Sequence, residues 1–347
     1  MSTTDWREPE SGLPPGGPGT PASGRSNRIK LVILLILLAG LGWVLLLVAQ
    51  YCQTHKPLGQ LPVVPVAGLG GPKFAYSGSL DGVQRPLGVA VSGDGTVYVA
   101  ETDGDRMIRM FDSKGRQAGA FAPPDTTIPG RVPLYIAVSP KGEIYVSDRE
   151  RRTIDIFSPK GDYVGAFKPQ SIAPEEWHPM GIAFDQRGNV YVTDLPENKH
   201  RVLVFDSSGA LKRQFGSQGQ ERGQFWFPSG IAVDGQGRIY VADGDNGRLQ
   251  VFDPQGNLLY VIPRGYAVGD LSLPRGVAVT KDRLFVADTS AHVVKIYDIS
   301  GEEPRFLSNV GDSAGKAQFR FPNGVALAGN RIYVADREND RVQIWSY

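Results

Sequence analysis

The sequence has few of the residues that form disulfides and metal sites. Its 347 residues include one cysteine, Cys52, and four histidines, His55, His178, His200 and His292. A single cysteine excludes a disulfide within the chain. A zinc site needs about three or four ligands that converge on the metal, whereas these histidines are scattered along the chain. We therefore expect no cofactor.

An excess of charge is also missing. Lysine and arginine number 37, and aspartate and glutamate number 36. The first 59 residues hold five of the basic and three of the acidic residues, so 32 basic and 33 acidic residues remain in the rest. A surface that reads a nucleic-acid backbone normally carries a basic excess, so we expect no nucleic-acid partner. A Gly-rich phosphate loop of the P-loop type is absent as well.

Glycine and proline, by contrast, are abundant, with 43 and 26 residues. This composition suits a β protein with many turns. Residues 227–262 show the pattern most clearly, with β-branched and aromatic runs at 230–233, 238–242, 248–252 and 258–262. Clusters of Asp, Gly, Asn and Pro, which favour turns, separate the runs. No window has a 3.6-residue apolar period, so the stretch predicts four strands and no helix.

The same pattern repeats along the chain. Pro-x-Gly followed by Ile or Val and Ala recurs at Pro86, Pro179, Pro228, Pro274 and Pro322, and a variant at Pro133 has Tyr135 in place of glycine. A second strand ends each time in an acidic residue, at Glu101, Asp148, Asp194, Asp243, Asp288 and Asp336, with spacings of 47, 46, 49, 45 and 48 residues. A period of this length built from four strands indicates the blades of a propeller.

The repeat resembles the NHL repeat. The resemblance rests on segments such as Pro-Ser-Gly-Ile-Ala-Val at 228–233, Ile-Tyr-Val-Ala-Asp at 239–243 and Asn-Gly-Arg-Leu-Gln-Val-Phe at 246–252. It implies an all-β fold, a six-bladed β-propeller of four-stranded antiparallel blades. It does not imply one function, because related propellers include binding modules, sensors, lyases and lactonases.

The N-terminal segment differs in composition from the repeats. Residues 1–28 are rich in Pro, Gly, Ser and Thr and predict a disordered cytoplasmic tail. Residues 31–49 carry no charge, and this length nearly crosses a bilayer as a helix, so we expect one transmembrane helix over 29–49. A cleaved signal peptide is the alternative, although its apolar region is usually about 7–15 residues long. Arg25, Arg28 and Lys30 precede the apolar run, which orients a single-pass protein of the cell membrane with its N-terminus cytoplasmic and its propeller extracytoplasmic.

Residues 50–60 read as a linker and 61–347 as the propeller. The sixth repeat has only three strands before Tyr347, whereas 61–67 (Leu-Pro-Val-Val-Pro-Val-Ala) resembles a last strand. We therefore expect 61–67 to close the last blade, because ring closure removes exposed sheet edges.

Candidate binding residues follow from the repeat register. The first strand of each blade should line the axis, so the residue between Pro and Gly should lie at the channel mouth on what we call the top face. These residues and the aromatic loop residues predicted beside them are Leu87, Tyr135, Met180, Ser229, Arg275, Asn323, Trp177, His178 and Trp226. Loop aromatics either anchor a partner or fold down as caps over the blade. The acidic residues that end second strands, and Arg106, Arg201, Arg248 and Arg341 at the start of third strands, are expected to be structural.

These features favour a non-catalytic, membrane-anchored recognition or scaffold module. Its ligand would be a protein, a peptide or an envelope glycan bound on the top face. The alternative is a propeller enzyme of the lactonase or lyase type with a metal in the central channel, and a structural calcium there stays open.

Overall fold

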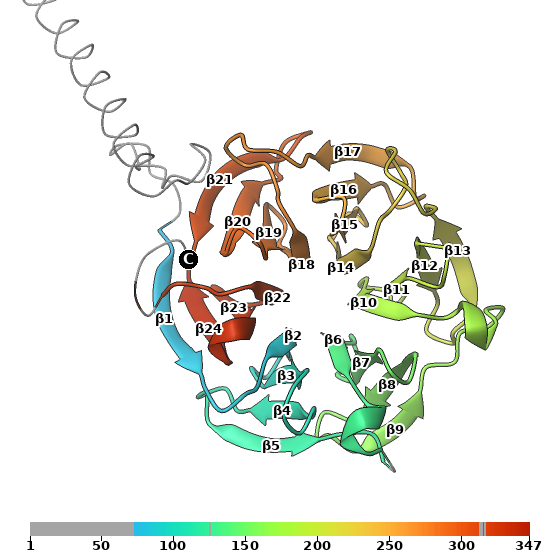
Figure 1. Ribbon diagram of the computed structural model, residues 1–347, viewed down its shortest axis with the longest axis vertical. Coiled ribbons are helices and arrows are strands. Elements are labelled where there is room, and N and C mark those ends of the chain that lie inside the picture. The colour runs from blue at the N-terminus through green and yellow to red at the C-terminus, as the bar shows by residue number, and fades with distance from the viewer. Residues whose placement is uncertain (1–72, 125, 312–314, 316) are drawn as a thin grey trace, which may run out of the picture. The chain divides into compact units, whose positions relative to one another are not determined.

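The structure is a computed structural model that describes residues 73–124, 126–311, 315 and 317–347, and these residues form a six-bladed β-propeller (Figure 1). Each blade is one antiparallel sheet of four strands. The innermost strands β2, β6, β10, β14, β18 and β22 surround the axis, as Figure 1 shows. The predicted fold class is thus confirmed for the described residues.

The first three blades follow one another in the chain. Blade 1 comprises β2 (Pro86–Val91), β3 (Val97–Glu101), β4 (Ile108–Phe111) and β5 (Gln117–Phe121). Blade 2 comprises β6 (Pro133–Val138), β7 (Ile144–Asp148), β8 (Thr153–Phe157) and β9 (Tyr163–Ala166). Blade 3 comprises β10 (Pro179–Phe184), β11 (Val190–Asp194), β12 (Arg201–Phe205) and β13 (Leu211–Phe215).

The remaining blades complete the ring. Blade 4 comprises β14 (Pro228–Val233), β15 (Ile239–Asp243), β16 (Arg248–Phe252) and β17 (Leu258–Ile262). Blade 5 comprises β18 (Pro274–Val279), β19 (Arg283–Asp288), β20 (Val293–Asp298) and β21 (Arg305–Val310). Blade 6 comprises β22 (Pro322–Ala328), β23 (Arg331–Asp336), β24 (Arg341–Ser346) and, from the other end of the chain, β1 (Ala75–Leu80). Short 3-10 turns lie at η2 (Ile128–Gly130), η3 (Pro174–Glu176) and η4 (Arg337–Asn339).

Ring closure occurs, but through a different segment from the one predicted. β1 pairs with β24, from Ala75 opposite Ser346 to Leu80 opposite Val342. Residues 61–67 lie outside the described residues, and the position assigned to them is taken by β1. The prediction rested on the apolar character of residues 61–67. An outer strand, however, is covered on one face only, and the two prolines of 61–67 could not donate ladder hydrogen bonds. The Ser- and Gly-containing β1, with its side chains alternately exposed and covered, meets both requirements.

The second strands form the core between blades. All five residues of β3, β7, β11 and β15 are buried. The equivalent aromatic residue of every blade is at most 8% exposed, namely Tyr98, Tyr145, Tyr191, Tyr240, Phe285 and Tyr333. These aromatics are therefore core residues, as their repetition predicts.

The segments expected to be the tail, the transmembrane helix and the linker lie outside the described residues. Within the part of the chain that the structure describes, no helix has the length and apolar character needed to cross a membrane.

Candidate functional site

The glycine of the Pro-x-Gly motif is required by the close approach of neighbouring blades. A Cβ atom at Gly230 would lie 2.3 Å from the carbonyl oxygen of Arg275 in the next blade, and one at Gly276 would lie 2.0 Å from that of Asn323. The same collision would occur at Gly88, Gly181 and Gly324. These glycines have no left-handed φ, so space rather than backbone conformation selects them. The innermost strands consequently form a tight collar around the axis.

Tyr135, the exception to the motif, closes this collar. Its hydroxyl lies 3.4 Å from Asn323 Oδ1 and 3.5 Å from the carbonyl oxygen of Arg275, so the side chain reaches from blade 2 to blades 5 and 6. Only 8% of Tyr135 is exposed, and burial raises the pKa of its hydroxyl. The channel that remains beside the ring has a volume of about 80 Å³. Tyr135 thus projects into the channel, as predicted, and its side chain is buried there.

The channel offers no set of side chains for a metal. Its lining consists of Tyr135 and of Gly, Val and Ile residues from the innermost strands. Calcium prefers six to eight oxygen ligands, most of them carboxylates or carbonyls. In the described part of the chain, no three His, Cys, Asp or Glu residues converge as metal ligands would. The side chains that line the described channel therefore supply no ligand set of the kind that a catalytic zinc needs.

Two of the predicted mouth residues are buried. Ser229 is 0% exposed, and its hydroxyl donates to the carbonyl oxygen of Arg275 at 3.2 Å. Asn323 is 6% exposed and faces Tyr135. Both side chains contact neighbouring blades, and their role as ligand contacts stays a prediction. Sequence register located them correctly at the collar but could not tell which way they point.

Leu87 and Met180 pack around Tyr135 and its neighbours. Both are half-buried and pack against a cluster that consists of Val132, Leu134 and Tyr135. They surround the ring on the axis and present little surface to a ligand.

Trp177 and His178 also turn inward. Trp177 is 5% exposed and packs on Phe167 and Phe205, with ring centroids 6.4 and 5.9 Å apart. It is therefore a cap over blade 3. The ring of His178 has Nδ1 3.1 Å from the carbonyl oxygen of Leu195, so Nδ1 carries the proton and donates, while Nε2 is buried without a partner.

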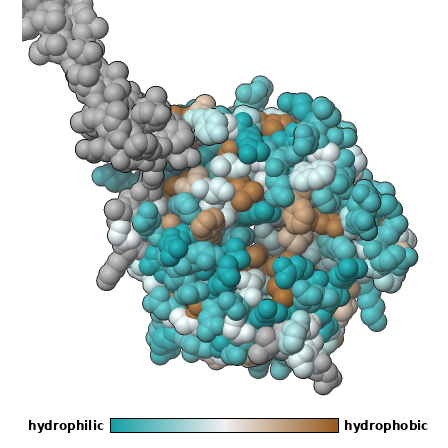
Figure 2. Space-filling model, viewed as in Figure 1, coloured by the Kyte–Doolittle hydropathy of each residue, from teal (hydrophilic) through white to brown (hydrophobic). Residues whose placement is uncertain are grey.

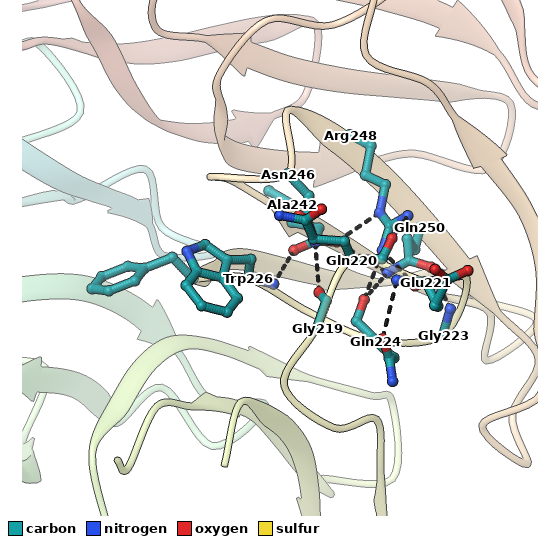
Figure 3. A network of polar contacts seen from close by, with 12 residues as sticks. Gly219, Gln220, Glu221, Gly223, Gln224, Trp226, Ala242, Asn246, Arg248 and Gln250 are labelled. Atoms are coloured by element: carbon teal, nitrogen blue, oxygen red, sulfur yellow. Dashed lines mark hydrogen bonds and ion pairs between the residues drawn. The ribbon is translucent and has the colours of Figure 1, made fainter. Parts of the chain in front are cut away.

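Trp226, by contrast, is an exposed aromatic residue on a rigid support. Its side chain is 40% exposed, and its backbone N–H donates to Asp243 Oδ1 at 2.7 Å. Asp243 is fully buried and also accepts from Arg248 Nε at 2.7 Å. Arg248 in turn donates to the carbonyl oxygens of Gln220, Glu221 and Gln224, as Figure 3 shows. This network fixes the loop before blade 4 and holds Trp226 at the surface.

Blade 6 repeats this arrangement. Its loop ends in Gln-Phe-Arg-Phe-Pro-Asn-Gly at 318–324, which parallels Gln-Phe-Trp-Phe-Pro-Ser-Gly at 224–230. Asp336 accepts from Arg341 Nε at 2.8 Å, and Arg341 and Gln343 both donate to the carbonyl oxygen of Gln318. The result is another exposed aromatic residue, Phe321, at a position equivalent to Phe227.

Three of the six residues that precede the strand-one prolines have a left-handed backbone. They are Arg85 with φ 43°, Phe227 with φ 59° and Phe321 with φ 53°. This conformation is unfavourable for a bulky side chain. Phe227 and Phe321 are 43% and 40% exposed, and the side chain of Arg85 is 41% exposed, whereas Val132 at the equivalent position of blade 2 is buried. The strained backbone therefore turns these three side chains outward.

A histidine of the preceding blade supports each of the two phenylalanines. The N–H of Phe227 donates to His200 Nδ1 at 3.3 Å, and the N–H of Phe321 donates to His292 Nδ1 at 3.0 Å. The rings meet edge-on, with centroids 5.7 and 4.6 Å apart. Burial lowers the pKa of His200, which favours the neutral ring that can accept this bond.

Two further arginines lie along the same side of the mouth. Arg275 Nη2 donates to Asp245 Oδ1 at 2.9 Å, and the backbone N–H of Asp245 bonds to the carbonyl oxygen of Trp226. Arg337 in η4 is electrostatically coupled to both Arg85 and Arg275. We call the exposed surface formed by blades 4, 5, 6 and 1 the top-face arc, and it consists of Trp226, Phe227, Arg275, Phe321, Arg337 and Arg85. Seen down the axis, the mainly polar surface carries apolar patches around its centre (Figure 2).

Of the arc, the sequence predicted Trp226 and Arg275 as site residues. Arg85 and Phe321 precede the motif by one position, and Arg337 follows the acidic residue of the second strand by one position. The repeated Gln-Phe-x-Phe-Pro segment was the signal that could have identified Phe227 and Phe321.

A cavity larger than the channel lies on the opposite face. It has a volume of about 470 Å³ between blades 3 and 4 and is lined by turn residues such as Asp185, Asn189, Asp234 and Gln255. The carboxylates of Asp185 and Asp234 are used within their own turns, where they accept backbone N–H groups two and four residues on. This cavity is a polar groove between blades, with no cluster of reactive groups.

Comparison with known proteins agrees with the fold. The NHL repeat model matches residues 177–205, 225–252 and 319–345. No curated protein matches the sequence. Among solved structures, streptogramin B lyase is similar with 16% identity and a TM-score of 0.56, over 79% of this chain and 97% of that one.

Two further solved structures, one of an enzyme and one of a protein complex, have a similar fold. A catalytically inactive variant of virginiamycin B lyase from Staphylococcus aureus with quinupristin has 17% identity and a TM-score of 0.56, over 79% of this chain and all of that one. A chain of a nidogen–laminin complex has 16% identity and a TM-score of 0.52, over 67% of this chain and 90% of that one. At these identities the likeness concerns the fold alone.

Proposed function

We propose that this chain, an NHL-repeat protein with a six-bladed β-propeller, is a recognition module that binds a protein or peptide partner on the top-face arc. The observation that carries the proposal is the left-handed backbone of Arg85, Phe227 and Phe321. Such a conformation costs roughly 1–3 kcal/mol per residue and persists where the surrounding structure enforces it, typically at functional sites. Here it exposes two large aromatic side chains and one arginine beside the channel mouth.

The composition of the arc suits a protein partner. Trp, Phe and Arg are enriched at the cores of protein interfaces, and Trp and Arg dominate their binding energy. The loops that carry Trp226 and Phe321 are fixed by the buried Asp243 and Asp336 networks. A preformed surface loses little conformational entropy on binding, which favours affinity.

The enzyme alternative depends on the channel, and Tyr135 leaves only about 80 Å³ of it open. The lining of this volume has no carboxylate or imidazole. Among proteins of similar fold, one is described as a lyase and another occurs in a complex of nidogen with laminin. The fold therefore hosts catalysis and binding alike, and the side chains favour binding.

The membrane anchor expected over 29–49 completes the proposal. β1 leads into blade 1 at the top face, so in an antiparallel blade its first residue, Ala75, lies at the opposite face. The 25 residues between Ala49 and Ala75 could span at most about 80–90 Å. A tether of this length would leave the arc of an anchored propeller accessible to an extracytoplasmic partner.

Site-specific photo-cross-linking on the full-length protein in membranes tests the proposal. A photoreactive amino acid replaces Trp226 on the arc in one variant and Gln255, in a turn of the opposite face, in another. We expect a discrete cross-linked partner from position 226 only. Phe227→Gly with Phe321→Gly should abolish the product while the protein remains folded, because glycine tolerates the left-handed backbone.

A matched control uses apolar residues exposed elsewhere. Val164 in β9 and Leu259 in β17 are 59% and 46% exposed on outer strands, so Val164→Ala with Leu259→Ala removes exposed apolar surface outside the arc. The cross-link should survive in this variant. Cross-linking from position 255 instead of 226, or equal loss in both double variants, would contradict the proposal.

A further inference from the structure

The tripeptide Asp-Arg-Glu occurs twice in the sequence, at 148–150 and at 336–338. Both copies follow a second strand, in blades 2 and 6. In blade 2, Arg149 has a side chain that is 63% exposed and pairs with Glu150 at 3.3 Å. In blade 6, Arg337 is 32% exposed and belongs to the top-face arc. The same three residues therefore sit in two different electrostatic environments.

Arg337 is poorly neutralised in its environment. Its nearest carboxylate oxygen is Glu338 Oε1, 3.8 Å from Nη1, and its Nε is buried without a hydrogen-bond partner. Burial lowers the pKa of Arg337, the charges of Arg85 and Arg275 lower it further, and Glu338 alone opposes them. A buried guanidinium N–H with no acceptor is costly, and the side chain can meet an added acceptor through the part that is exposed.

Arg85 shares the same carboxylate. Its Nη2 donates to Glu338 Oε1 at 2.7 Å, and its own Nε is also buried without a partner. One oxygen of Glu338 thus faces two guanidinium groups. Asp340, the other acid close by, accepts the backbone N–H of Arg85 at 2.8 Å, and Asp245 is paired with Arg275. Two Nε–H groups on neighbouring arginines remain unsatisfied.

We propose that Arg85 and Arg337 form a carboxylate-binding site for an acidic segment of a polypeptide partner, an inference that rests on the proposed function and names the chemistry of its ligand. The planar guanidinium fork matches a carboxylate with two parallel hydrogen bonds. Glu338 is an internal carboxylate that already occupies part of the site and competes with the ligand.

The residues around Arg85 and Arg337 favour a ligand in which an aspartate or glutamate is next to an aromatic or aliphatic residue. The N–H of Glu338 donates to the carbonyl oxygen of Arg320 at 3.1 Å, which brings η4 beside the loop that ends in Phe321. A segment that places its carboxylate on Arg85 and Arg337 can therefore lay a neighbouring apolar side chain on Phe321. Charge pairing supplies orientation, and the aromatic contact supplies buried apolar area.

Two matched peptides test the inference on the full-length protein in detergent micelles. The probes are N-acetyl-Phe-Glu-Glu-Phe-amide and N-acetyl-Phe-Gln-Gln-Phe-amide, and binding is followed by calorimetry and by NMR of the arginine Nε–H signals. We expect the glutamate peptide to bind about tenfold more tightly and to shift the Nε–H signals of Arg85 and Arg337. Arg337→Gln should remove this difference.

The two Asp-Arg-Glu segments of the chain, at 148–150 and 336–338, provide the control variants. Glu338→Gln should strengthen binding of the glutamate peptide about threefold, because the competing carboxylate is gone while the arginines remain. Arg149→Gln and Glu150→Gln, the equivalent changes in blade 2, should leave the affinity within about twofold, since residues outside the site couple to it only weakly.

The outcomes separate the two proposals. Equal binding of the two peptides, or equal effects of Arg337→Gln and Arg149→Gln, would overturn the carboxylate site. If Phe227→Gly with Phe321→Gly then still abolished cross-linking of the partner, recognition by the arc would stand without it. Displacement of the glutamate peptide by inorganic phosphate but not by glutarate would assign a phosphate site and would also overturn the inference.

Discussion

The hydroxyl of Tyr135 lies 3.4 Å from the side-chain oxygen of Asn323, although 188 residues separate them in the sequence. The contact joins blade 2 to blade 6 across the axis and closes the collar of innermost strands. The side chain of Tyr135 lies in the channel, beside glycines of other blades. Blade 2 can therefore carry tyrosine where the other blades carry glycine.

Tyr135 should therefore be important for stability. Tyr135→Gly gives blade 2 the motif of the other blades but empties the channel, and we expect a loss of about 3 kcal/mol in the free energy of unfolding. Tyr135→Phe removes only the long hydroxyl contacts and should cost about 1 kcal/mol or less. Urea denaturation of both variants measures the difference. A Tyr135→Gly protein as stable as the natural one would show that the ring does not fill the collar.

Closure by β1 predicts where the chain can be shortened. A chain that begins at Gly70 keeps Ala75–Leu80 and should melt at the same temperature as the intact propeller. A chain that begins at Gly82 lacks β1 and exposes the edge of β24, which promotes aggregation. Thermal melts with light scattering compare the two. Equal behaviour would mean that β1 contributes nothing to blade 6.

Asp155 should make stability depend on pH. It is buried in β8, where it accepts from Arg151 Nη2 at 3.1 Å and from the Tyr163 hydroxyl at 3.3 Å. Burial raises its pKa from 3.8 to about 6, Asp148 adds to the shift, and Arg151 opposes it. The folded protein keeps the proton that the unfolded chain releases near pH 4, so stability falls as the pH rises from about 4 to about 6 and then levels off.

Asp155→Asn removes this dependence. The gain in the free energy of unfolding over the natural protein should grow across the same pH window and reach about 1–3 kcal/mol at pH 7. Asp253→Asn is the control, because hydrogen bonds, that from Asn257 first, lower the pKa of this exposed carboxyl. The effect of this substitution should be constant from pH 4.5 to 7.5, because the contribution of a carboxyl with a lowered pKa is lost only below about pH 4. Melting temperatures at pH 4.5, 6 and 7.5 test both, and parallel profiles for the two variants would refute the prediction.

Asp243 should determine the order of the loop that carries Trp226. Asp243→Ala leaves the largely buried Arg248 without its carboxylate, and the loss of one partner of such a pair costs about 3–5 kcal/mol. The backbone N–H of Trp226 also loses its acceptor, so its hydrogen exchange should become faster. Asp298→Ala breaks a pair with the exposed Arg305 and should cost much less stability, because solvent screens exposed ion pairs. Unchanged exchange at Trp226 in Asp243→Ala would contradict this view of the network.

Sequence alone determined the number of blades, the buried aromatic position and the strands of each blade except the outer strand of blade 6. These features depend on local alternation and turn residues, which every repeat encodes within its own period. It also identified the acidic residues as structural. In blades 3, 4 and 6 they pair with Arg201, Arg248 and Arg341 as expected. In blades 1 and 5 the cation comes from the middle of the third strand, as Arg109 and Lys295.

Tertiary structure alone decided which side chains face solvent at the channel mouth. Ser229, Arg275 and Asn323 share one register position, yet only Arg275 turns outward, toward Asp245. Their directions depend on the carbonyl groups of the next blade and on the ring of Tyr135 from across the axis. The arc likewise needs a left-handed backbone at Arg85, Phe227 and Phe321, which loop contacts and the histidines of neighbouring blades stabilise. A repeat pattern specifies pairing within a blade, whereas closure of the ring sets the contacts between blades.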